Sequence, residues 1–173
     1  MNEVIKNIKE RRSIRKYEDK MIPKEIIEEI LEAGTYAPSG MGRQSSIIIA
    51  ITNKEIRDKL SKLNAQIMGV ESDPFYGAPV VLVVLGKKDI PTYIYDGSLV
   101  MENLMLSANS LGIGSCWIHR AKQEFETEEG KDILRKLGIN PDEYEGIGNC
   151  ILGYKQEEGT LKPRKENYVY YID

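Results

Sequence analysis

Histidine, cysteine and tryptophan are scarce in this chain. Its 173 residues include one histidine (His119), two cysteines (Cys116 and Cys150) and one tryptophan (Trp117). A single histidine excludes a His-rich metal site. Each cysteine lies in an apolar run, which is typical of a small core residue and not of a disulfide framework or a metal knuckle. The sequence also lacks a G-x-S-x-G elbow, a P-loop and a Cys-x-x-Cys pair. The common hydrolytic, phosphate-loop and thiol-redox motifs are therefore absent.

The chain has neither a basic excess nor a long apolar run. Its net charge of −3 argues against nucleic acid as the main partner. No apolar stretch approaches the roughly 20 residues that a membrane span requires, and the charged N-terminus does not resemble a secretion signal. Hydrophobic residues at 41% and charged residues at 29% are ordinary for a globular protein of one domain. We therefore expect one cytoplasmic domain over residues 1–173, without membrane or nucleic-acid partners.

Apolar periodicity predicts a mixture of helices and strands. Pro23 suits the first position of a helix that Gly34 closes, and Thr52 with Glu55 forms a capping-box pattern before another helix. The helices are predicted at 5–9, 23–34, from 52 onward, 93–111 and 127–137, and the strands at 47–51, 80–85, 113–118 and 147–154. The continuous apolar runs at 47–51 and 80–85 indicate buried strands. These patterns are compatible with either a parallel or an antiparallel sheet.

A dinucleotide-binding fingerprint begins at Gly112-Ile113-Gly114 but is not completed. Trp117 stands where the third glycine is needed, and the segment precedes a strand instead of a phosphate-binding helix. This excludes a Rossmann site, so any nicotinamide would have to bind transiently.

Two basic clusters lie at opposite ends of the chain. Arg11, Arg12, Ser13 and Arg15 place three guanidinium groups and a hydroxyl within five residues, and Lys162 and Arg164 follow near the C-terminus. Arginine matches phosphate oxygens with paired donors. Taken singly, the clusters are compatible with a solvated turn and an ordinary charged tail. Their presence together in a net-acidic chain favours one shared anion.

Four motifs in order give the chain a family resemblance. They are the run 11–17 (RRSIRKY), the loop Ala37-Pro38-Ser39-Gly40 followed by Gln44, the segment 111–118 (LGIGSCWI), and Gly153-Tyr154 followed by Lys162-x-Arg164. In this order and spacing, over essentially the whole chain, they resemble the FMN-dependent nitroreductase family. The resemblance implies an α+β fold with a central mixed, mostly antiparallel sheet wrapped by helices. It also implies an intertwined homodimer with FMN at the subunit interface.

The resemblance assigns flavin contacts to residues in all four motifs. It implies that the phosphate and ribityl chain are held by Arg11, Arg12, Ser13, Lys162 and Arg164. Arg15 would lie at the N1/O2 edge of the ring, where a cation stabilises the charge left by reduction. Pro38, Ser39 and Gly40 would come from the partner subunit, and Gln44 would also contact the cofactor. Asn64 would read the pyrimidine edge. Trp117 and Ile118 would run past the flavin ring, and His119 and Arg120 would present their backbone N–H groups to N5 and O4.

The activity implied by the resemblance is reduction of nitroaromatics, quinones or similar small acceptors by NADH or NADPH in a ping-pong cycle. No catalytic side chain is required, because the flavin carries the chemistry; His119 is the weak candidate for a proton donor. The alternatives are a flavin-storing module or a specialised flavin enzyme of the same fold. The family often has Asn and Pro-Trp where this chain has Gly42, Ser45 and Ser46, which bears on pocket shape and substrate range. Trp117 is interpreted as a packing residue, and Tyr168 to Tyr171 as dimer packing.

Overall fold

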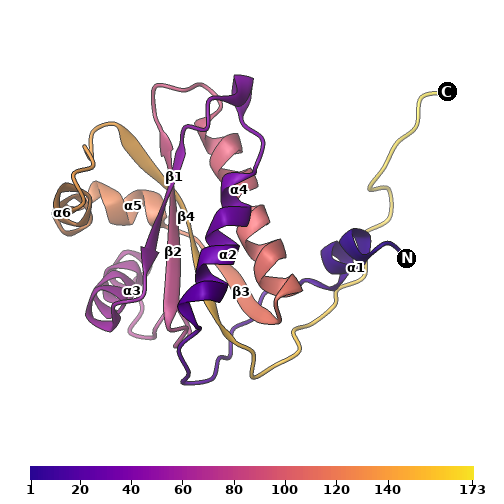
Figure 1. Ribbon diagram of the computed structural model, residues 1–173, viewed down its shortest axis with the longest axis horizontal. Coiled ribbons are helices and arrows are strands. Elements are labelled where there is room, and N and C mark those ends of the chain that lie inside the picture. Colours follow the sequence, from indigo (N-terminus) through magenta and orange to yellow (C-terminus); the bar gives the residue numbers. More distant parts are fainter.

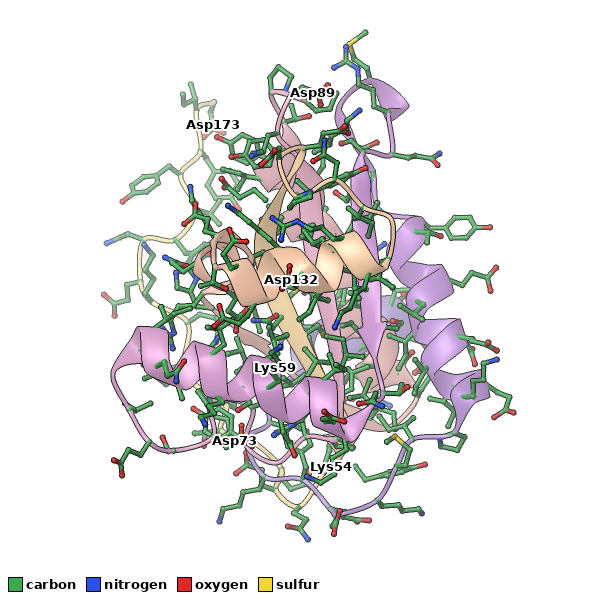
Figure 2. The ribbon with its side chains drawn as sticks, turned by 90° about the vertical axis from the view of Figure 1, so that its left-hand side faces the viewer. Lys54, Lys59, Asp73, Asp89, Asp132 and Asp173 are labelled. Carbon is green, nitrogen blue, oxygen red and sulfur yellow. The ribbon has the colours of Figure 1, made fainter.

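The computed structural model describes residues 1–173 and places a four-stranded sheet between two layers of helices (Figure 1). Helices α2 and α4 cover one face, and α3, α5 and α6 cover the other. Figure 2 views the second face, with Lys59 marking α3 and Asp132 marking α6. The elements are α1 (Glu3–Glu10), α2 (Lys24–Thr35), a 3-10 turn (Gly40–Gly42), β1 (Ser46–Ile51), α3 (Lys54–Met68), β2 (Val80–Lys87), α4 (Tyr93–Ser110), β3 (Ile113–Ile118), α5 (Ala121–Glu126), α6 (Glu128–Lys136) and β4 (Tyr144–Tyr154).

All strand pairs in the sheet are antiparallel, in the order β1-β2-β4-β3. This settles the direction that the residue pattern left open and confirms the α+β class. A single parallel bridge joins Ser13 to Ser115 on the outer side of β3. In the β3–β4 register, Trp117 lies opposite Cys150 and Ile118 opposite Asn149.

Strand β2 explains how one apolar run serves two cores. Its even-numbered residues Val80, Leu82 and Val84 pack under α2 and α4, whereas its odd-numbered residues pack under α3, α5 and α6. Alternation of side chains across a strand produces this division. A strand buried on both faces reads as continuously apolar, so the prediction of a buried strand at 80–85 is confirmed.

Several predicted boundaries are wrong in detail. Thr52 does not cap α3; the Asn53 side chain accepts a hydrogen bond from the Ile56 amide at 3.0 Å and starts the helix one residue later. Pro23 is likewise the residue before α2, and that helix continues through Gly34 to Thr35. β1 is an edge strand that buries only Ile49 and Ile51, because its outer side has no neighbour.

Two further elements differ from expectation. The segment Ala121–Glu126 forms α5, which the sequence analysis did not predict, and β4 begins at Tyr144, three residues earlier than expected. A six-residue helix is too short for its periodicity to stand out. Thr127 ends α5 and caps α6, whose predicted position is otherwise confirmed.

The two ends of the chain meet along β3 and β4. The Ile14 amide donates to the Ser115 carbonyl at 2.9 Å, and the Gln156 amide donates to the Lys16 carbonyl at 3.0 Å. Helix α1 is attached to α4 through Asn7, whose side chain donates to the Leu106 carbonyl at 2.9 Å. These contacts bring the N-terminal basic cluster beside the segment that follows β4. Beyond it the tail is extended and exposed (Figure 1).

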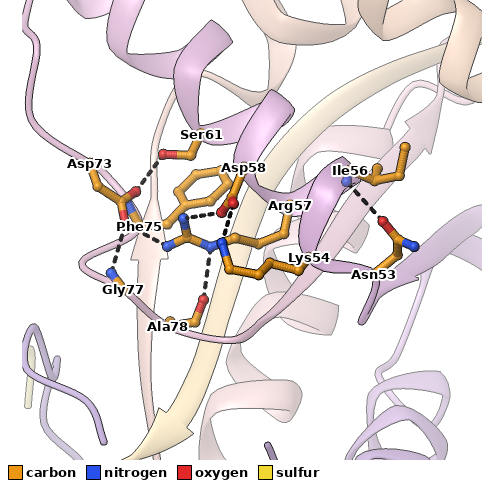
Figure 3. A network of polar contacts seen from close by, with 10 residues as sticks. All are labelled: Asn53, Lys54, Ile56, Arg57, Asp58, Ser61, Asp73, Phe75, Gly77 and Ala78. Carbon is orange, nitrogen blue, oxygen red and sulfur yellow. Dashed lines mark hydrogen bonds and ion pairs between the residues drawn. The ribbon is translucent and has the colours of Figure 1, made fainter. Parts of the chain in front are cut away.

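The loop between α3 and β2 is fastened by a buried arginine (Figure 3). Arg57 donates to the Ala78 carbonyl at 2.9 Å and to Asp73 at 2.6 Å. Burial alone would raise the pKa of Asp73, but hydrogen bonds from Ser61, Arg57 and the Gly77 and Phe75 amides outweigh it and lower that pKa. The loop, which contains Tyr76, is therefore a fixed part of the scaffold.

Candidate functional site

The two predicted basic clusters form one hollow of about 950 Å³. Its volume is at the upper end of the range for small-molecule sites. Ser13 and Glu157 line it together with six cations: Lys9, Arg11, Arg12, Arg15, Lys162 and Arg164. Six cations against one carboxylate, in a chain of net charge −3, make this hollow a site for an anion.

Arg11 supplies the clearest unsatisfied donor in the hollow. Its Nη1 atom is buried and has no hydrogen-bond partner, and its Nε lies 3.9 Å from Glu102. Buried polar groups are normally paired, so an orphaned guanidinium N–H indicates a missing acceptor. The neighbouring Arg12 donates to the Lys9 and Arg11 carbonyls at 2.6 and 2.7 Å, which closes the end of α1. A phosphate oxygen is the acceptor that such a donor set fits.

Arg15 lies at the edge of the hollow and is exposed. Its backbone amide donates to the Glu157 carboxylate at 2.5 Å, and its guanidinium lies 6.0 Å from the centre of the Tyr76 ring. Tyr76 lies within the loop fastened by Arg57 and has a left-handed backbone (φ 52°). Arg15, the cation predicted to lie at the edge of the flavin ring, is therefore held through its backbone amide and lies beside the aromatic ring of Tyr76.

The loop at residues 38–44 lines a different hollow, of about 510 Å³. Pro38, Ser39 and Gln44 face it together with Asp96 and Val100 of α4. Asp96 is buried and accepts a hydrogen bond from the Gly40 amide at 3.0 Å, so α4 fixes the position of this loop. Within one chain the loop and the basic hollow are separate, as expected if the loop serves a neighbouring subunit.

β3 is followed by a turn with a left-handed residue, at His119 and Arg120, the residues predicted to face the flavin ring. Trp117 is half-buried and packs against the core under α2 and α4. Gly148 leaves room for its indole, because a Cβ atom at position 148 would lie 2.5 Å from the indole nitrogen. His119 is exposed, and Arg120 has a φ of 79°. The backbone N–H groups of His119 and Arg120 donate to no acceptor within the chain. The turn therefore presents two free donors.

Asn64 is fully buried and contacts this turn directly. Its Nδ2 donates to the His119 carbonyl at 2.8 Å, and its Oδ1 accepts from Arg120 Nε at 3.1 Å. Oδ1 keeps a second lone pair, which is the acceptor left for the pyrimidine edge predicted from the resemblance.

Sequence reasoning missed a buried carboxylate behind the same turn. Glu124 on α5 is completely buried and accepts from Asn64 Nδ2 and from Asn149 Nδ2, each at 2.7 Å. Burial raises its pKa to about 7 against the pull of those two amides and of Arg120. Ala121, Glu124 and Phe125 have the spacing of one buried helical face, and this spacing was the sequence signal that could have indicated the burial of Glu124. Asp96 and Glu157 were missed as well, and neither stands in a recognisable motif.

The layered α+β fold places a basic hollow, suited to an anionic ligand, beside the edge of its sheet. Residues 8–154 match the model described as Nitroreductase family, and the chain belongs to that family.

Relatives cover nearly the whole chain. A protein of Archaeoglobus fulgidus, provisionally named NADH dehydrogenase/NAD(P)H nitroreductase, is 34% identical over 91% of this chain and 88% of its own length. A nitroreductase with bound FMN from Bacteroides fragilis is 31% identical, with a TM-score of 0.87 and full coverage of both chains. A nitroreductase with bound FMN from Desulfitobacterium hafniense is 26% identical, with a TM-score of 0.88 and the same coverage. No helix of this chain is long and apolar enough to span a membrane.

Proposed function

We propose that this protein is an FMN-dependent oxidoreductase that takes electrons from NADH or NADPH and delivers them to a small acceptor such as a nitroaromatic or a quinone. The observation that carries the proposal is the hollow lined by six cations, in which Arg11 has a buried donor without an acceptor. Family membership and the FMN bound by two similar nitroreductases support it.

The basic hollow would hold the phosphate end of the cofactor. Arg11, Arg12, Lys162 and Arg164 would bind the phosphate, and Ser13 the ribityl chain. When bound, FMN supplies the two-electron chemistry that protein side chains lack. Arg15 would act as a fixed cation at the N1/O2 edge, held by its backbone bond to Glu157.

The turn after β3 would supply donors to the ring. The unpartnered N–H groups of His119 and Arg120 are suited to the N5 and O4 acceptors, with Trp117 and Ile118 leading into the turn. In this arrangement the backbone acts and the His119 side chain need not. Residues 1–173 would form one FMN-binding domain in the cytoplasm.

The first test of the proposal concerns cofactor retention. We expect wild-type protein incubated with excess FMN and then desalted to keep about one FMN per chain. Arg11→Ala should bind FMN roughly 10- to 100-fold more weakly, which corresponds to about 1.5–3 kcal/mol for a charge-assisted hydrogen bond. Fluorescence titration measures this loss.

The matched control is Lys24→Ala, which removes an exposed cation on α2 outside the basic hollow. It should bind FMN like the wild type. Wild-type protein that emerges colourless from desalting would refute the proposal. Anaerobic reduction of the bound flavin by NADH or NADPH no faster than that of free FMN would instead indicate a storage module.

The protein is also proposed to be a homodimer, with Pro38, Ser39, Gly40 and Gln44 completing the partner's flavin site. Large apolar side chains are exposed on α1 and in the tail: Val4, Ile5, Ile8, Tyr168, Val169, Tyr170, Tyr171 and Ile172. Within each of these two segments the apolar side chains lie close in sequence, and large exposed apolar patches mark interaction surfaces. We expect sedimentation to give twice the 19.6 kDa of the chain, and a variant ending at Glu166 to dissociate at higher concentration. A 19.6 kDa species that binds FMN tightly would contradict this.

A further inference from the structure

A buried polar cluster lies directly behind the turn that ends β3. Its centre is Glu124, whose two carboxylate oxygens each accept one amide hydrogen bond at 2.7 Å, from Asn64 on α3 and from Asn149 on β4. All three side chains are completely buried. None of the three lines the basic hollow, and neither Glu124 nor Asn149 is assigned a flavin contact.

Glu124 is an unfavourable residue for this position in purely structural terms. An ionised carboxylate deep in a protein loses its hydration, and burial raises the pKa of Glu124 to about 7. The charged group acting on it is the Arg120 guanidinium, which lowers that pKa. The other neighbours are uncharged: α3 and β4 contribute amides, and α6 approaches with Gly130 against the Glu124 carbonyl.

Asn64 connects this carboxylate to the turn. One Nδ2 hydrogen goes to Glu124 and the other to the His119 carbonyl at 2.8 Å, while Oδ1 accepts from Arg120 at 3.1 Å. Both amide hydrogens are therefore used, and the orientation of the amide is fixed from the Glu124 side. A bond to an ionised acceptor is roughly twice as strong as one to a neutral acceptor. Charge on Glu124 thus determines how firmly Asn64 holds the turn.

We propose that Glu124 is a positioning residue whose negative charge orients Asn64, which in turn fixes the His119 carbonyl and the Arg120 guanidinium at the end of β3. The functional meaning rests on the proposed function, because this turn is the one assigned to the flavin ring. Removing the charge loosens the turn without disturbing the basic hollow.

Glutamine at position 124 is a suitable neutral replacement. Asn149 Oδ1 is buried and has no partner, so rotation of that amide provides an acceptor for a glutamine Nε2. The glutamine Oε1 keeps the bond from Asn64. Glu124→Gln therefore preserves volume and hydrogen bonds while it removes only the charge.

The single histidine makes the turn directly observable. Labelling with [1-13C]histidine marks one carbonyl in the chain, the atom that accepts from Asn64. We expect its NMR shift to titrate with a component centred near pH 7 in the wild type. That component should be absent in Glu124→Gln, and in Asn64→Leu, where Glu124 is disconnected from the turn. Every variant keeps His119, so the comparison rests on the difference between each variant's curve and the wild-type curve.

The control is Glu126→Gln, which removes an exposed carboxylate from the same helix and should leave the component unchanged. Identical titrations in the wild type and Glu124→Gln would overturn the proposal. The comparison of these two proteins is sufficient even if Asn64→Leu does not fold. The measurement is made with and without added FMN. Failure of the protein to take up flavin would count against the proposed function, whereas an unresponsive carbonyl would count against Glu124.

Discussion

Replacing Arg120 with proline is expected to abolish flavin-dependent turnover and to lower the free energy of unfolding by about 3 kcal/mol or more. Arg120 has a φ of 79°, and the proline ring requires a φ near −65°. The exchange also deletes a backbone N–H that has no acceptor within the chain and is assigned to the flavin ring. Denaturant unfolding and steady-state turnover with NADH measure the two losses.

Two other variants separate the backbone from the side chains. Arg120→Gly suits the left-handed backbone and keeps the N–H, so it should retain most of the activity despite losing the bond to Asn64. His119→Ala should likewise have a modest effect, because the His119 side chain is exposed. A loss of roughly a hundredfold or more in His119→Ala would instead identify a general acid and contradict the backbone assignment.

The second large effect is a pH-dependent difference in stability between the wild type and Glu124→Gln. The pKa of Glu124 rises from 4.5, its ordinary value, to about 7 in the folded protein. The folded state therefore holds this proton more tightly than the unfolded chain does. Protonated Glu124 stabilises the fold below about pH 4.5, and this contribution is lost as the pH rises through 7. The full difference is about 3 kcal/mol at 1.36 kcal/mol per pKa unit.

Glu124→Gln should thus match the wild type near pH 4 and exceed its stability by about 3 kcal/mol at pH 8. Chemical denaturation at several pH values gives the difference directly, and the other titrating groups cancel because both proteins share them. A constant difference across this range would mean that Glu124 does not change its protonation state there. A carboxylate that lowers stability beside a functional turn agrees with the common trade-off between stability and activity.

Sequence patterns predicted the parts of this molecule that depend on local chemistry. The apolar run of β2 reads correctly because a strand buried on both faces has no polar side. The basic motifs at Arg11 and Lys162 also fall together as the resemblance implied, since the bridge from Tyr17 to Lys155 joins the two ends of the chain. Both successes rest on strong signals: a continuous apolar strand and charges in a recognisable order.

The features that were missed depend on tertiary contacts. Thr52 and Asn53 are adjacent residues that can both cap a helix, and only the path of the chain leaving β1 selects Asn53. Glu124 reads as one charge among many, and its burial results from α5 packing on β4, where a Cβ at Gly146 would lie 2.3 Å from Ala121. The partners of Pro38 and Ser39 belong to an assembly that a single sequence does not describe.

The exposed edge of β1 affects how the isolated chain can be handled. The strand Ser46–Ile51 carries three consecutive isoleucines, no charge and no proline, and its outer backbone groups have no strand partner. An uncharged edge of this kind is a template for strand addition by another molecule. Arg43 and Lys54 are the charged residues nearest to its two ends. A preparation kept dilute should therefore resist aggregation longer than a concentrated one.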